Sequence, residues 1–311
     1  TYESMLRTFS PEGIWPQDNQ WGMHDYTREG AQGCTSFNEI IAKGYGEPQS
    51  AKEFAELAQW VNYDGHRSLF ESRSQNRKGL LMWMSHSCWP SMVWQTYDYY
   101  FEPTAAYFAI KKASEPLHIQ WNPATDEVEV VNYSAGTHKG LTAKVQILNM
   151  DASVAWEKEA TVDSNEDTTN KCIKLAFPAN LSKVHFIKMV LTENGKVVSD
   201  NFYHRSLEEN NYQDLRQLAK VALQSTTTVD KNADGTWSAV SVIENKTSTP
   251  ALMIRLNVVG SKDGQQLLPV FYSDNYFSLL PGEKKEVRMS WKDEDTRGNE
   301  GKVLITGYNV E

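Results

Sequence analysis

The last two thirds of the chain alternate apolar and polar residues in short runs, and this pattern leaves few folds open. From Leu117 onward the runs are separated by clusters of turn-forming residues, as expected for β-strands with one face buried and one face in solvent. Examples are Glu127–Val131, Ala143–Leu148 and Phe186–Leu191. Strands this short and this regularly spaced are typical of a β-sandwich.

The strand-rich part divides into two predicted sandwiches. The first spans about 122–206 and contains Asn194-Gly195, a dipeptide preferred in tight hairpins. A polar stretch over 207–224 predicts a linker helix, and the second sandwich follows over 225–311. The Cys…Trp…Cys pattern of antibody domains is absent from the sequence, so we expect the immunoglobulin-like architecture without its disulfide.

Two helices are predicted upstream of the sandwiches. Ser50 to about Ser74 carries apolar residues with a period near 3.6, and Ser50 followed by Glu53 forms a capping box at its start. A second helix is expected over Thr104–Ser114. It ends in Lys111-Lys112, and cations in a last turn suit the negative end of the helix dipole.

An apolar run and an aromatic segment lie between these two helices. Gly79–Met84 is long enough for one strand buried on both faces. The aromatic residues within and after it are Trp83, Trp89, Trp94, Tyr97, Tyr99, Tyr100 and Phe101. Strand, aromatic loop and helix in this order are the pattern of one βα unit of an α/β barrel, whose functional loop follows the carboxyl end of the strand.

The aromatic segment and the helix after it resemble glycoside hydrolase family two. Two patterns are met at fixed spacing, W-x-x-x-x-x-W-x-S-x-x-W-Q-x-x-D and A-Y-(F/Y)-x-x-K-K-A-x-E-P-L-H-(I/V)-Q. The matching residues are Trp83, Trp89, Ser91, Trp94, Gln95, Asp98, Ala106, Tyr107, Lys111, Lys112, Ala113, Glu115, Pro116, Leu117, His118 and Gln120. The branch that the chain resembles is that of exo-β-D-glucosaminidases, with endo-β-mannosidases near it, and the similarity extends more thinly over nearly the whole chain.

The resemblance implies a multidomain architecture, the C-terminal part of a (β/α)8 barrel followed by two immunoglobulin-like β-sandwiches. Residues 1–121 would be the last loop, seventh helix, eighth strand and eighth helix of that incomplete barrel. A full barrel takes about 250 residues. A partial barrel exposes apolar faces, so we expect either missing N-terminal domains of the same protein or self-association to cover them.

The resemblance also implies a sugar-binding site built partly by this chain. It places Trp83 at the end of the eighth strand, facing the pocket floor, and Trp89 in the loop beyond. Where the glucosaminidases have Asn-Ser-Pro, this chain has His86-Ser87-Cys88, so an imidazole replaces a pocket amide. Trp83, His86 and Trp89 are therefore the predicted substrate-binding residues, with core packing open as an alternative for Trp83 and favoured for Trp94.

No catalytic residue is predicted within the chain. A retaining glycosidase uses two carboxyls about 5–5.5 Å apart, and the resembling enzymes carry them at the ends of the fourth and seventh barrel strands, upstream of Thr1. The acids that flank the aromatic loops are Asp25, Glu29, Asp98 and Glu102, and we expect each to be a surface or ion-paired group. The chain alone is therefore expected to be inactive.

Composition limits the partners and cofactors. A net charge of −9 without a basic patch argues against nucleic acid, and no apolar run approaches the ~20 residues that span a bilayer. The widely spaced Cys34, Cys88 and Cys172 offer neither a disulfide framework nor a C-x-x-C metal signature. We predict no cofactor and no metal. The 10 Trp and 14 Tyr suit a partner that stacks on aromatic rings, such as a β-linked oligosaccharide.

Two functions stay open at this point. The first is a secreted or periplasmic exo-β-glycosidase, glucosaminidase-like or mannosidase-like, to which this chain contributes part of the sugar-binding wall and two structural sandwiches. The alternative is a non-catalytic β-sandwich protein that binds carbohydrate or serves as a scaffold. Glu115-Pro116-Leu117-His118 favours the first, because a binding module has no need of this motif after a barrel strand.

Overall fold

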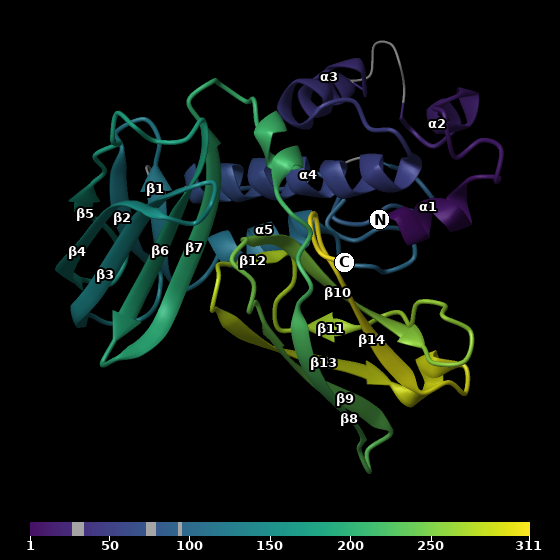
Figure 1. Cartoon of the computed structure of the whole chain (residues 1–311). Helices are drawn as coiled ribbons and strands as arrows, with labels where there is room; N and C mark the ends of the chain where they lie inside the picture. The colour runs from purple at the N-terminus through teal and green to yellow at the C-terminus, as the bar shows by residue number, and fades with distance from the viewer. Residues whose placement is uncertain (27–33, 73–78, 93–94) are drawn as a thin grey trace. The chain divides into compact units, whose positions relative to one another are not determined.

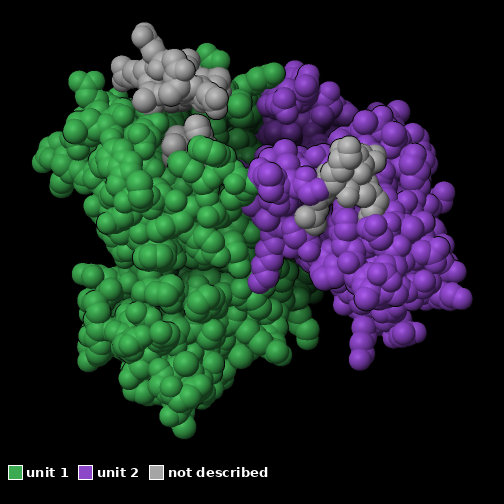
Figure 2. Space-filling view, turned by 180° about the vertical axis from the view of Figure 1, so that it is seen from behind, with its two compact units in different colours: residues 1–63, 82–108, 217–311 green, residues 64–81, 109–216 purple. Residues whose placement is uncertain are grey.

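The computed structural model describes residues 1–26, 34–72, 79–92 and 95–311. The chain forms two compact units, shown in different colours in Figure 2. Unit 1 consists of Thr1–Tyr63, Met82–Phe108 and Gln217–Glu311, and unit 2 consists of Asp64–Leu81 and Ala109–Arg216. Within the described residues, no helix combines the length and the apolar character that crossing a membrane requires.

The α-helices of the described residues lie before residue 114. They are α1 (Tyr2–Thr8), α2 (Asn19–Met23), α3 (Cys34–Tyr45), α4 (Ala51–Ser72) and α5 (Ala105–Ala113) (Figure 1). The helices predicted over Ser50 to about Ser74 and over Thr104–Ser114 are confirmed as α4 and α5. At the start of α4, the backbone N–H of Glu53 donates to Ser50 Oγ at 3.2 Å, and the Glu53 carboxylate accepts from the backbone N–H of Gln49 at 2.7 Å. The capping box is therefore formed, with its return bond displaced by one residue.

The strand predicted for Gly79–Met84 is not formed, and this corrects the barrel part of the expected architecture. These residues have irregular backbone, and Leu81 is 99% exposed. A buried parallel strand needs hydrogen-bonded neighbours on both sides. In the described residues, the nearby pairing is limited to isolated bridges of Tyr97 with His86 and with Pro103. What the described chain shows is sandwich-like sheets with a few helices, and a barrel part is not evident.

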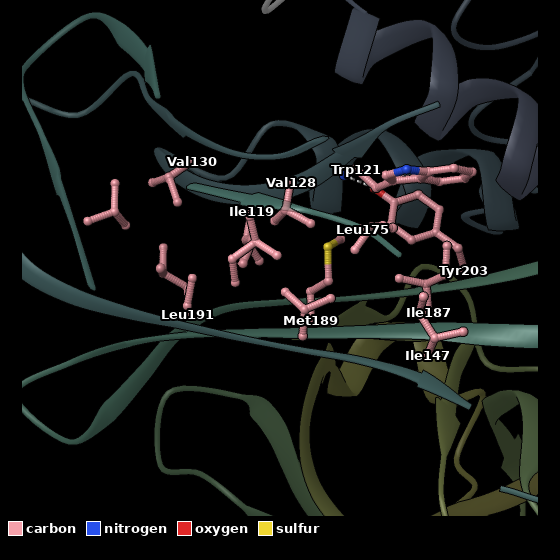
Figure 3. Packing of buried hydrophobic residues seen from close by; sticks show 14 of the residues in the cluster. Ile119, Trp121, Val128, Val130, Ile147, Leu175, Ile187, Met189, Leu191 and Tyr203 are labelled. Carbon is pink, nitrogen blue, oxygen red and sulfur yellow. Dashed lines mark hydrogen bonds between the residues drawn. The ribbon is translucent and has the colours of Figure 1, made fainter. Parts of the chain in front are cut away.

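Unit 2 is built on two antiparallel sheets, ordered β1-β2-β5 and β4-β3-β6-β7. The strands are β1 (Leu117–Asn122), β2 (Glu127–Asn132), β3 (His138–Asn149), β4 (Val154–Ser164), β5 (Thr168–Lys174), β6 (Val184–Glu193) and β7 (Lys196–Ser206). The core lies between the sheets, where fully buried Ile119 and Val130 pack with Ile147 and Met189 (Figure 3). The period of two places these residues on the inner faces of the sheets.

The sandwich of unit 1 also has two sheets, ordered β12-β10-β14 and β11-β13-β9-β8. The strands are β8 (Gln224–Lys231), β9 (Thr236–Glu244), β10 (Ala251–Gly260), β11 (Phe271–Tyr272), β12 (Phe277–Leu279), β13 (Lys284–Lys292) and β14 (Gly301–Thr306). Ile254, Leu256 and Val287 are fully or almost fully buried between the sheets. Trp291 belongs to this core, and Trp237 packs against it with the two rings nearly parallel and their centroids 6.4 Å apart.

The linker helix predicted over 207–224 is mostly absent. The structure has only the 3-10 helix Gln213–Gln217 there, and β8 begins at Gln224. Leu215 and Val221 are buried, but the residues around them are mostly polar and supply no continuous apolar stripe. Because helices in proteins draw most of their stability from packing such a stripe, the segment does not form a longer helix.

The hairpin predicted at Asn194-Gly195 joins β6 to β7, with Glu193 paired to Lys196. Gly195 has a φ of 76°, so Gly195→Ala is expected to lower the free energy of unfolding by about 1–2 kcal/mol. Gly65→Ala is the matched control, because Gly65 lies inside α4 with open space around an added Cβ, and it should raise stability by about 0.5–1 kcal/mol. Urea unfolding of both variants checks the opposite signs, and a neutral Gly195→Ala would contradict the turn assignment.

Candidate functional site

Exposed aromatic side chains gather on one loop of unit 1. We call the described residues 82–92 and 95–103 the aromatic loop. Trp83 is 78% exposed, Phe101 57%, Trp89 41% and Tyr99 40%. Large apolar side chains are rarely left in solvent together without a function, so this loop is the candidate binding surface.

Backbone hydrogen bonds connect the two segments of the aromatic loop, 82–92 and 95–103. The Ser85 carbonyl accepts hydrogen bonds from the backbone N–H groups of Thr96 at 3.1 Å and of Tyr97 at 3.0 Å. His86 forms a bridge with Tyr97, and the exposed His86 ring stacks on Phe101 with centroids 4.8 Å apart and planes 21° apart. The predicted site residue His86 is thus part of a stacked pair with Phe101.

The second predicted tryptophan also stacks on an imidazole. The rings of Trp89 and His24 are 5.5 Å apart with planes 26° apart. The His24 ring is oriented by its Nδ1 atom, 2.7 Å from the Pro90 carbonyl oxygen, and Met92 donates its N–H to the His24 carbonyl at 3.1 Å. These bonds hold the segment around His24 against the aromatic loop.

A buried polar network lies beneath the loop in unit 1. Glu102 is 5% exposed, and its carboxylate forms an ion pair with Arg255 of β10. The same carboxylate accepts hydrogen bonds from Gln266 Nε2 at 2.7 Å and Thr1 Oγ1 at 2.7 Å. Arg255 Nη1 also lies 3.1 and 3.0 Å from the two carboxylate oxygens of Glu3. Every oxygen of Glu102 therefore has a partner.

These contacts set the charge states of the two loop carboxyls. Burial by itself would raise the pKa of Glu102, but the Arg255 guanidinium and the hydrogen bonds from Gln266 and Thr1 lower that pKa to about 2. Burial and the neighbouring charge of Glu102 raise the pKa of Asp98, which accepts a hydrogen bond from Ser4 Oγ. Glu102 stays ionised and committed to its partners, so it cannot act as a general acid.

The predicted substrate-binding residues Trp83, His86 and Trp89 are all exposed on the aromatic loop. The candidate acid Asp25, which directly follows His24, is exposed as well. Trp94 and Glu29 lie outside the described residues. Phe101 and Arg255 are site residues that sequence reasoning did not single out. Phe101 stood within a recognised aromatic cluster, whereas nothing in the sequence pairs Arg255 with a residue 153 positions away.

A second buried polar cluster lies in unit 2 around His118 of the family motif. His118 Nε2 is 3.2 Å from a Glu71 oxygen, and His118 Nδ1 is 3.1 Å from a Glu115 oxygen. Glu71 also accepts hydrogen bonds from Asn201 at 2.8 Å and from the Tyr203 hydroxyl at 2.9 Å. His118 is 1% exposed, so the cluster is out of reach of a substrate and serves to hold the unit together.

Comparisons with known proteins connect both units to one enzyme family. The profile of the exo-beta-D-glucosaminidase Ig-fold domain matches residues 201–310. The exo-beta-D-glucosaminidase of Streptomyces avermitilis is 31% identical over 305 residues, covering 88% of this chain and 34% of that protein. The mannosylglycoprotein endo-beta-mannosidase of Lilium longiflorum is 24% identical, covering 93% of this chain and 37% of that protein. The chain thus spans about a third of the length of the curated relatives that it matches.

Solved structures agree with the sequence comparison. The Amycolatopsis orientalis exo-chitosanase CsxA superimposes with a TM-score of 0.90 at 28% identity, over 100% of this chain and 40% of CsxA. One matching CsxA structure is a complex with PNP-beta-D-glucosamine. The beta-D-mannosidase of Dictyoglomus thermophilum matches with a TM-score of 0.74 over 99% of this chain and 36% of its own, and at 18% identity it supports the fold alone.

Proposed function

Because the chain is related to the exo-β-D-glucosaminidases of glycoside hydrolase family two and carries their Ig-fold domain, we propose that it supplies part of the sugar-binding wall of an exo-β-glycosidase. The enzyme would be of the retaining class and act on β-linked oligosaccharides, glucosaminidase-like or mannosidase-like. The relatives that match are glycosidases of both kinds. Which of the two sugars fits depends on the pocket, where His86 stands in place of an amide.

The exposed aromatic loop is the observation that carries this proposal. Trp83 offers 78% of its surface to solvent, and Trp89 and His86 lie on the same loop with partly exposed rings stacked on neighbours. An aromatic ring presents a flat apolar face, which matches the C–H face of a pyranose, while the indole N–H can bond a hydroxyl. Stacked partners restrict the ring orientations, so less freedom is lost when a sugar binds.

We assign neither catalytic carboxylate to this chain. A nucleophile and an acid/base must face the same glycosidic bond. Glu102 is buried and bound to Arg255, Asp98 is buried and bonded to Ser4, and Asp25 is exposed. The nucleophile and the acid/base would therefore belong to other segments of a (β/α)8 barrel completed by the rest of the protein or by a partner copy. That protein would be secreted or periplasmic, with no nucleic-acid or membrane partner.

Hydrolysis and binding assays on the 311-residue chain test the proposal. We expect no turnover of p-nitrophenyl β-D-glucosaminide or β-D-mannoside. In calorimetric titration with a chitosan oligosaccharide and with a β-mannan oligosaccharide, Trp83→Ala is expected to weaken binding of the preferred sugar about tenfold, the effect of losing about 1.4 kcal/mol. Phe271→Ala, which removes a ring that is 68% exposed on β11, is the matched control and should change nothing.

Two outcomes would contradict the proposal. Turnover by the chain alone would require a nucleophile among its own acids. Binding that Trp83→Ala leaves unchanged would instead support the alternative, a β-sandwich protein that binds carbohydrate elsewhere on its surface.

A further inference from the structure

A carboxylate shapes the turn that presents Phe101 to His86. Asp98 Oδ1 accepts hydrogen bonds from the backbone N–H groups of Tyr100 at 2.9 Å and Glu102 at 3.0 Å. The Asp98 N–H donates to the Glu102 carbonyl at 3.0 Å, which closes the turn. Phe101 sits at its corner with a φ of 66°, a left-handed conformation that disfavours side chains other than glycine.

The turn is anchored through Glu102 to segments far away in the sequence. The Glu102 carboxylate is bound by Arg255 from β10, by Gln266 from the segment between β10 and β11, and by Thr1. Arg255 in turn holds Glu3 of α1. The C-terminal sandwich and Thr1, the N-cap residue of α1, therefore both bind the Glu102 carboxylate at the base of the aromatic loop.

We propose that Glu102 and Arg255 are positioning residues for the sugar-binding aromatic loop, so that the C-terminal sandwich takes part in substrate recognition. This inference rests on the function proposed for the loop. Glu102 is 5% exposed and Arg255 has both terminal nitrogens bound to carboxylates. They act through Phe101 and His86 and make no contact with sugar themselves.

The Glu102–Arg255 ion pair and the left-handed turn at Phe101 stabilise each other. Removing one member of a buried ion pair leaves the other charge uncompensated, and the structure must open to hydrate it. A left-handed residue persists only where its surroundings over-determine it. Without the anchor, Phe101 would leave its stacked position and the loop would sample several conformations. The apparent Kd rises in inverse proportion to the fraction that stays competent to bind.

The test uses Glu102→Gln and Arg255→Lys in the full 311-residue chain. Arg255→Lys keeps the positive charge but has a single terminal nitrogen, so it cannot bind Glu3 and Glu102 as the two guanidinium nitrogens of arginine do. It is the milder change and keeps the test possible if Glu102→Gln fails to fold. Two quantities are measured: the Kd for the preferred oligosaccharide, and the proton NMR shift of the His86 ring, which the ring current of Phe101 displaces. For a competent fraction of about one tenth, we expect the Kd to rise about tenfold, with loss of the ring-current shift.

Two further variants separate positioning from stability. Glu102→Gln combined with Arg255→Gln removes both charges of the ion pair, so neither is left buried without its partner, and it should recover part of the affinity and part of the His86 shift. Lys231→Gln removes an ion pair of the same unit, Lys231 with Asp293 at 2.8 Å, whose side chains are half exposed. It is the control and should alter neither quantity.

The outcomes distinguish this inference from the proposed function. If both single variants only lower the unfolding temperature while Kd and the His86 shift stay at their original values, the pair is merely structural and the inference is wrong. If Trp83→Ala leaves binding unchanged, the proposed function fails and the recognition role fails with it. In that case the His86 shift still shows whether the ion pair positions the loop.

Discussion

Replacing Glu71 by alanine is expected to lower the free energy of unfolding of unit 2 by about 3–5 kcal/mol, the usual cost of removing one partner from a buried charged pair. Glu71 is 6% exposed and faces His118 at 3.2 Å. Its carboxylate also accepts hydrogen bonds from Asn201 and Tyr203. The truncation takes the Glu71 acceptor away from an imidazole, an amide and a phenol in a dry interior, and each lost hydrogen bond adds to the cost.

Hydrogen exchange of the β1 and β7 amides measures this loss within unit 2. Glu71→Gln keeps the shape and one acceptor oxygen, so its effect should be smaller than that of Glu71→Ala. Glu159→Ala, at an exposed position of β4, is the matched surface control and should stay within about 0.5 kcal/mol. A loss below about 1 kcal/mol in Glu71→Ala would mean that the network holds the unit far less than its burial indicates.

The stability of unit 2 is expected to fall on both sides of neutral pH, because two buried histidines titrate in opposite directions. For His118, burial alone would lower the pKa, but the hydrogen bonds to Glu115 and Glu71 raise the pKa above its ordinary value. The folded state therefore favours the protonated form. The stabilisation from His118 is fully present below a pH of about 6.5 and is lost as pH rises through the raised pKa.

The contribution of His204 to stability changes with pH in the opposite direction. Burial lowers the pKa of His204 to about 4, although the charge of Asp64 opposes the shift. The folded state favours neutral His204, so its contribution is present above a pH of about 6.5 and is lost as pH falls toward 4. A shift of this size corresponds to about 3 kcal/mol.

Unfolding free energies measured across the pH range, with one histidine removed at a time, check both signs. His204→Gln is expected to flatten the acid side of the profile, and His118→Gln the alkaline side, after allowance for the lower overall stability of each variant. If either variant flattens the opposite side, or leaves both slopes unchanged, the assignment of that histidine is wrong.

The sandwich strands were predictable because the sequence pattern that specifies each strand lies within a few neighbouring residues. One inward and one outward face give a period of two, and Asn194-Gly195 takes positive φ at both residues where the turn between β6 and β7 requires it. Helix α4 was predictable for a similar reason, since a capping serine and an apolar period of 3.6 lie within one stretch of chain. Helix α5 was predictable from Lys111-Lys112, because cations in a last turn suit the helix dipole.

The two wrong predictions concern elements whose stability comes from other parts of a molecule. Gly79–Met84 has the composition of a buried strand, but strand formation also requires neighbouring strands, and the described residues pair none with it. The segment 207–224 has helix-forming residues but no apolar stripe to bury, so only Gln213–Gln217 becomes helical. Composition alone could not separate these cases from true elements.

The sequence by itself determined the two sandwiches, the helices α4 and α5, the family, and the aromatic loop that carries Trp83, His86 and Trp89. Only the tertiary structure decided which groups meet beneath these elements, such as Glu102 with Arg255, 153 residues apart, and Glu71 with His118, 47 residues apart. Periodicity, capping and turn chemistry act between residues a few positions apart, so a pattern records them. The partner of a buried charge is set by where the folded chain brings its distant segments together, and no local pattern carries that information.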